Sequence, residues 1–140
     1  MDDSGRQRWL STVILVGVLY LVVGITSATL AGAAASDKMQ FFWRLSAFII
    51  SALVFAAHLA YDHFRLRNTT RSTAWHASVG VAFGAFALAL VANIHDLGSA
   101  SGYRPRMLIA LVAWPLLTAV PAFIVALVVA AGLGFTRLRV

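Results

Sequence analysis

The chain has 140 residues, of which 61% are hydrophobic and only 11% are charged, and its mean hydropathy is +0.85. A soluble domain carries about 25% charged residues, and a soluble fold of this length could not bury so much apolar surface, so a soluble globular protein is excluded. The net charge of +6 does not indicate nucleic-acid binding, because the cations stand singly or in pairs at the ends of apolar runs, as membrane anchors do. Without cysteine there is no disulfide, thiolate nucleophile or thiolate-bound metal.

The first apolar run covers residues 9–32. The sequence AGAAASD at its end resembles a signal-peptidase site, but the run is much longer than the roughly 7–15 apolar residues of a signal peptide. About 20 apolar residues are enough for a helix to cross a bilayer, so the run is predicted to be a retained membrane span. Gly24, Ala28 and Gly32 lie four residues apart on one face, and small residues at this spacing predict close helix packing.

The second run covers residues 41–62 and the third covers residues 75–94. Arg44, near the start of the second run, is expected to extend its side chain towards the membrane surface. Gly80 and Gly84 form a GxxxG pair in the third run and are predicted to pack against another helix or a second copy. Asn93 and Asp96 lie at the far end of the third run and are predicted to line the mouth of a polar pathway.

The fourth run, residues 107–135, is longer than a span requires, at about 43 Å if it is a straight helix. Pro115 and Pro121 are predicted to kink it, and they form a candidate hinge. The four runs together predict an all-α integral membrane protein, a single domain over residues 1–140 built as a bundle of four transmembrane helices with antiparallel neighbours and short loops.

The distribution of cations predicts the orientation of the bundle. Seven arginines lie at the two termini and in the second loop, against four Lys and Arg in the first and third loops and at their span ends. The positive-inside rule then places both termini in the cytoplasm, although the margin leaves insertion in both orientations open. Arg outnumbers Lys ten to one, which favours a bacterial source and hence the bacterial inner membrane.

The most polar stretch of the chain joins the second and third runs: HLAYDHFRLRNTTRSTAWH, residues 58–76. His58 and His76 each lie nine residues from Arg67, so an antiparallel helix pair would hold them at similar depth. Asp62 follows His58 by four residues on the same helix face, where it could fix the imidazole tautomer. His63 lies on another face and is expected among the lipid headgroups.

These residues support three interpretations. They are a polar membrane anchor, or a group that senses or conducts protons, or a haem or transition-metal site formed by His58 and His76. Four histidines are too few for a membrane di-iron hydroxylase, and the sequence favours a non-enzymatic role. No carboxylate lies in the middle of a predicted span, which argues against a small four-span proton-coupled drug exporter.

The leading functional hypothesis is an oligomeric membrane protein that moves or senses a small ion or solute through His58, Asp62, His76, Asn93 and Asp96. The first alternative is an accessory or scaffold subunit of a larger membrane complex. The second alternative is the haem- or metal-binding protein. The expected partners are the lipid bilayer, further copies of the chain or a larger complex, and no nucleic acid.

Overall fold

The structure is a computed structural model that describes residues 3–66, 69–98 and 106–137. Its helices are α1 (Asp3–Gly32), α2 (Asp37–Phe64), α3 (Thr70–Leu97) and α4 (Arg106–Arg137). No strand occurs in these ranges. Each helix contains a stretch long and apolar enough to cross a membrane, so the predicted four-helix membrane fold is confirmed.

Side-chain caps fix where the two middle helices begin. The Ser36 hydroxyl accepts a hydrogen bond from the Met39 backbone N–H at 3.3 Å, which starts α2. The Thr69 hydroxyl accepts a hydrogen bond from the Ser72 backbone N–H at 3.3 Å, which starts α3. α3 thus begins directly after the loop that carries Arg65 and Arg67, called the Arg-rich loop below. These caps satisfy backbone donors that a helix start leaves unpaired, and they lengthen the helices beyond the predicted apolar cores.

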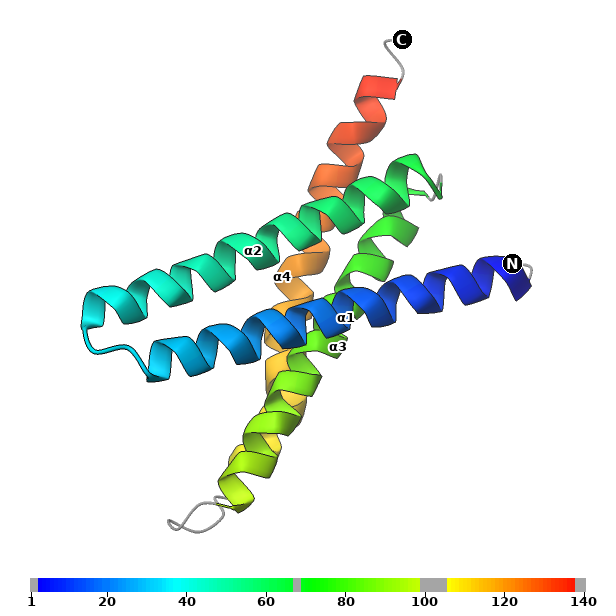
Figure 1. Ribbon diagram of the computed structural model, residues 1–140. Helices are drawn as coiled ribbons and strands as arrows, with labels where there is room; N and C mark the ends of the chain where they lie inside the picture. The colour runs from blue at the N-terminus through cyan, green and yellow to red at the C-terminus, as the bar shows by residue number, and fades with distance from the viewer. Residues whose placement is uncertain (1–2, 67–68, 99–105, 138–140) are drawn as a thin grey trace.

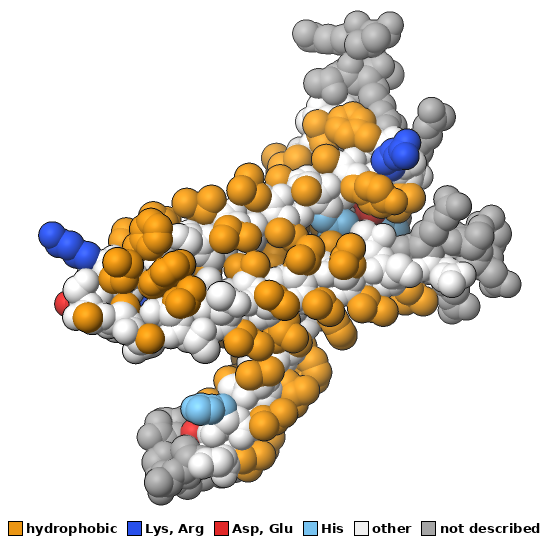
Figure 2. Space-filling view, in the orientation of Figure 1, with side chains coloured by type: hydrophobic (Ala, Val, Ile, Leu, Met, Phe, Trp, Pro, Cys, Tyr) orange, Lys and Arg blue, Asp and Glu red, His pale blue; other side chains and the backbone are white. Residues whose placement is uncertain are grey.

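The four helices form two hairpins that cross (Figure 1). α1 pairs with α2 and α3 pairs with α4, each pair antiparallel, and α3 lies across α1 at the crossing. α3 is the central helix: 39% of its apolar stretch is buried, against 11–17% for the other three. Most of the remaining apolar surface faces outward (Figure 2), as it must in a protein that lipid surrounds.

α2 and α3 follow one another in the chain but do not pack along their lengths. They meet near the loop that joins them and then diverge (Figure 1). The second and third spans were expected to form an antiparallel hairpin. They do so only over the turns of α2 and α3 that lie nearest to the loop between them. The reason is that the glycine face of α3 packs on α1 instead.

Small residues set the close approach of α1 and α3. A Cβ atom added to Gly84 would lie 2.7 Å from Tyr20 Cβ and 3.3 Å from the Gly17 carbonyl oxygen. One added to Gly24 would lie 2.6 Å from a methyl group of Leu88, and Gly80 faces Val16 in the same way at 3.4 Å. At Gly84 the helices can come this close only because the position lacks a side chain.

Ala28 and Gly32, predicted to continue this packing face, lie in a different setting. Both line a hollow between α1 and α2, and a Cβ added to Gly32 would meet no described atom within 4 Å. A packing role for Gly32 therefore requires a second chain and stays a prediction. Pro115 and Pro121 lie inside α4, which the structure assigns as one uninterrupted helix, and their role as a hinge also stays a prediction.

Replacing Gly84 by alanine is expected to lower the melting temperature in detergent, because the new methyl group meets a Cβ atom and a backbone oxygen that cannot rotate away. Overpacking of this kind costs about 1–3 kcal/mol. The matched control is Gly32→Ala, where the methyl group enters open space and the stability should not fall. The melting temperatures are measured by circular dichroism. Equal melting temperatures of the two variants would contradict the close approach of α1 and α3.

Candidate functional site

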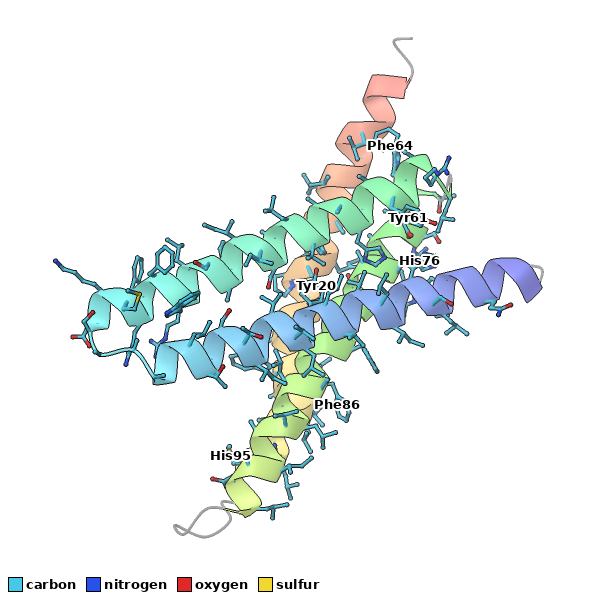
Figure 3. All side chains as sticks on the ribbon, in the orientation of Figure 1. Tyr20, Tyr61, Phe64, His76, Phe86 and His95 are labelled. Atoms are coloured by element: carbon cyan, nitrogen blue, oxygen red, sulfur yellow. The ribbon has the colours of Figure 1, made fainter. Side chains whose placement is uncertain are left out.

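Polar side chains from three helices meet at the end of the molecule where α2 passes into α3. The last two turns of α2 bury His58, Asp62 and His63, although this part of the helix lies next to a loop. His76 comes from the second turn of α3 and lies between α2 and α1, as labelled in Figure 3. The indole ring of Trp9, from the first part of α1, lies against the His76 imidazole with ring centroids 5.3 Å apart.

Asp62 lies between the two imidazoles. One carboxylate oxygen, Oδ2, is 2.8 Å from Nδ1 of His76, and the other, Oδ1, is 3.9 Å from Nε2 of His58. The exposed fractions of the side chains are 2% for Asp62, 1% for His58 and 12% for His76. A carboxylate this well buried is costly unless it is paired, and here His76 is its close partner.

The contacts of His76 define its tautomer. A carboxylate only accepts hydrogen bonds, so Nδ1 must carry the proton that is donated to Asp62. The other ring nitrogen, Nε2, lies 3.4 Å from the hydroxyl oxygen of Ser72, one turn earlier on α3. A hydroxyl both donates and accepts, so Ser72 can donate to neutral His76 and accept from the imidazolium.

His58 is held by packing rather than by hydrogen bonds. A Cβ added to Gly80 would lie 3.5 Å from Cε1 of His58, so the missing side chain of Gly80 makes room for this ring. Neither ring nitrogen of His58 has a hydrogen-bond partner among the described residues, and both are fully covered. A shift of about 0.7 Å would bring Nε2 within hydrogen-bonding distance of Asp62.

Two other buried polar atoms near the imidazoles lack partners within the described ranges, Trp9 Nε1 and Thr73 Oγ1. A buried donor or acceptor left unsatisfied costs about 1–3 kcal/mol. Each of these atoms is therefore a place where an additional hydrogen-bond partner would be stabilising. Figure 2 shows His and acid colouring between α1 and α2 at this end.

The predicted site residues fall into two separate groups. The structure brings His58, Asp62 and His76 together, but Asn93 and Asp96 lie in the last turns of α3, at the opposite end from His76. The label of the neighbouring His95 in Figure 3 marks that end of the helix. Because the hairpins cross, that end of α3 also lies away from the tip of the α1–α2 hairpin.

Asn93 forms a hydrogen bond between α3 and α4. Its side chain is 5% exposed, and Nδ2 donates to the Ala89 carbonyl at 2.8 Å and to the Met107 carbonyl of α4 at 2.9 Å. The bond to Met107 crosses from α3 to α4 near the loop that joins them. This geometry supports packing of the hairpin more directly than it supports the lining of a pathway.

Replacing Asn93 by alanine is expected to destabilise the α3–α4 hairpin by about 1 kcal/mol, since interhelical hydrogen bonds in membranes contribute roughly 0.6–1.7 kcal/mol. The measurement is unfolding in mixed micelles. His95→Ala is the control, because His95 is exposed two residues further along the same helix. A variant as stable as the control would show that the bond to Met107 contributes nothing.

The structure corrects one expectation and adds residues that the sequence pattern missed. His63 is 4% exposed and packs edge-to-face on Phe64, so its assignment to the headgroup region was wrong. Trp9, Ser72 and Thr73 were not among the predicted site residues. Spacing within α3 could have found Ser72, which precedes His76 by four residues, but nothing in the sequence places α1 beside α3.

A metal site finds no support in this geometry. The described residues contain no group of three or more His, Cys, Asp or Glu side chains arranged to hold a metal ion. The imidazole nitrogens that a metal or haem iron would need face a shared carboxylate instead. A haem or metal site formed by His58 and His76 alone stays a prediction.

No protein-family model matches the chain, and neither a curated protein nor a solved structure matches it. The function must therefore be argued from the site itself.

Proposed function

We propose that this small polytopic membrane protein moves or senses protons, with His58, Asp62 and His76 as the groups that hold them. The observation that carries the proposal is the buried Asp62 carboxylate between two imidazoles, 2.8 Å from one and 3.9 Å from the other. Imidazole is the side chain that ordinarily changes its charge between pH 5 and 8. Ionisable groups within a membrane span are expensive and rare, so each is by default a functional candidate.

The surroundings of His76 suit a group that gains and loses a proton. In the neutral ring, Nδ1–H donates to Asp62 and Nε2 accepts from the Ser72 hydroxyl. In the imidazolium, Nε2–H donates to the same hydroxyl, and the positive charge lies against the carboxylate. Both states are therefore satisfied without a change of partner. Ser72 lies near the start of α3, so a proton would reach His76 from the loop side.

His58 is the second step of the proposed route. It lies one helical turn before Asp62 and so deeper along α2 from the loop. When Asp62 turns towards it, Nε2–H of His58 can donate to the carboxylate, and a protonated Asp62 can instead pass its proton to a neutral Nε2. Beyond it, Tyr20 and Ser51 border an apolar hollow of about 530 Å³ at the helix crossing. A conducting protein would pass protons on through water in this hollow, whereas a sensor would end at His58.

We extend the proposal to location and assembly. The Arg-rich loop lies at the same end as the site, so the positive-inside rule puts the site on the cytoplasmic side of a bacterial inner membrane. The small buried fraction of α2 and α4 supports self-association in that membrane. Asn93 and Asp96 are left out of the route, because they occupy the far end of α3.

The test is proton flux into liposomes that contain the purified protein and a pH-sensitive dye. After an imposed pH step, the wild type is expected to equilibrate the lumen faster than empty liposomes. His76→Ala is expected to reduce that rate, and His95→Ala, which removes an exposed histidine at the other end of α3, is expected to leave it unchanged. A rate that is equal in all three proteins would contradict conduction through the site.

Sensing without conduction has its own readout. Trp9 lies against His76, and a cation beside an indole ring interacts with its electrons, so protonation of His76 should change the Trp9 emission. The difference in emission between the wild type and Trp9→Phe should then change with pH, and it should not change with pH in His76→Ala. If neither flux nor emission responds to pH, the site does not handle protons.

An accessory or scaffold subunit is the second candidate function. It is favoured by the large apolar side chains that remain exposed on α2 and α4, of whose apolar stretches only 11% is buried. Purification from native membranes distinguishes the two proposals. A stable complex with a different membrane protein would support the accessory role, and a homo-oligomer would oppose it.

A further inference from the structure

A second polar feature, distant from the histidines, lies near the tip of the α1–α2 hairpin. Arg44 stands seven residues after Asp37, the first residue of α2, which places it about 10 Å along the helix. The other Lys and Arg residues inside the four candidate spans, Lys38 and Arg71, lie in the first turn of their helices. Arg44 is therefore the described cation that lies deepest in a span.

Arg44 has no counter-ion in the described part of the chain. The ion pairs found there all involve Asp62, which lies near the other end of α2. Asp37 is on the same helix but about 10 Å away along its axis. Charged residues within membrane spans almost always have a partner, and Arg44 is exposed, so its guanidinium is open to an anion supplied from outside the chain.

The side chain of Arg44 lines a hollow of about 420 Å³ between α1 and α2. The α1 wall is built mainly from residues that are too small to fill the space: Gly24, Ser27, Ala28, Ala31 and Gly32. Gln40 adds an amide one turn before Arg44, on the same side of α2. No acidic side chain lines the hollow, and α3 and α4 contribute nothing to it, so it opens sideways towards lipid.

We propose that this hollow binds a phosphate group, with the Arg44 guanidinium as the charged ligand and the Gln40 amide and Ser27 hydroxyl as additional donors. The planar guanidinium forms paired hydrogen bonds with phosphate oxygens, and it keeps its charge under all physiological conditions. The small residues of α1 leave the space that the anion occupies. The lateral opening admits the headgroup of a phospholipid, while the nearby helix ends admit a phosphate from solution. This inference does not depend on the proposed proton function.

The experiment is native mass spectrometry of the full chain in detergent with three probes: a phosphatidylglycerol, the diacylglycerol with the same acyl chains, and inorganic phosphate. The wild type is expected to retain the phosphatidylglycerol and not the diacylglycerol, which lacks the phosphate. Arg44→Gln should retain roughly tenfold less, which is the effect of losing a charge-assisted pair worth about 1.4 kcal/mol. Arg71→Gln is the matched control, because Arg71 is an exposed arginine on another helix, and its lipid retention should equal that of the wild type.

Each outcome decides the proposal. Binding of phosphatidylglycerol that depends on Arg44 and resists millimolar phosphate identifies a lipid headgroup as the source. Displacement of the lipid by phosphate in the wild type, together with Arg44-dependent binding of phosphate itself, identifies a soluble anion. Equal retention by wild type and Arg44→Gln, or equal retention of diacylglycerol and phosphatidylglycerol, would overturn the assignment. Circular dichroism of Arg44→Gln confirms that any loss is not caused by unfolding.

Discussion

Replacing Asp62 by alanine is expected to lower the free energy of unfolding by about 1–3 kcal/mol, the usual cost of leaving a buried donor without its acceptor. The side chain is 2% exposed, and its Oδ2 accepts the hydrogen bond from His76 at 2.8 Å. Without the carboxylate, the His76 Nδ1–H loses its acceptor, and His58 keeps two covered nitrogens with no carboxylate beside them. The measurement is reversible unfolding in mixed micelles.

Two further variants show which property of Asp62 matters. Asp37→Ala removes the same residue type from the exposed first turn of the same helix and should change the stability by less than about 0.5 kcal/mol. Asp62→Asn keeps an oxygen that can accept from His76 but removes the charge, so its stability should fall between the wild type and Asp62→Ala. If Asp62→Ala is as stable as Asp37→Ala, the carboxylate does not hold the three helices together.

The four spans could be predicted because their signal is local. An apolar run either reaches the length of a bilayer or does not, and lipid allows no backbone structure other than a helix for such runs. The pairing of His58 with Asp62 follows from the four-residue spacing within one helix. The contact between His76 and Asp62 could also be predicted locally. Both residues lie within two helical turns of the short loop that joins α2 to α3.

The contribution of α1 to the site could not be predicted in this way. Trp9 and His76 are 67 positions apart, and they meet because Gly84 and Gly80 let α3 cross α1 closely. GxxxG spacing identifies a packing face but not the partner, since every span carries small residues. Asn93 lies at the opposite end of α3 from His76, and its predicted role with Asp96 at the opposite mouth of a pathway stays a prediction.

The strongest test of the proposed function is a double-mutant cycle on the two imidazoles. His58→Ala and His76→Ala should each reduce proton flux in liposomes by about a hundredfold, near the lower limit of what a positioned proton-transfer group contributes. Both rings act through the same carboxylate, so the double variant should lose no more than the more impaired single variant. Groups that act as one unit are non-additive, whereas independent groups add.

A control pair makes the non-additivity interpretable. His76→Ala combined with His95→Ala should show only the loss caused by His76→Ala, because His95 is exposed at the opposite end of α3 and lies outside the route. Full additivity of His58→Ala and His76→Ala would mean that the two histidines act independently and that Asp62 does not connect them. In that case the close contacts of Asp62 would stabilise the helix ends, and the movement of protons would have to follow another path.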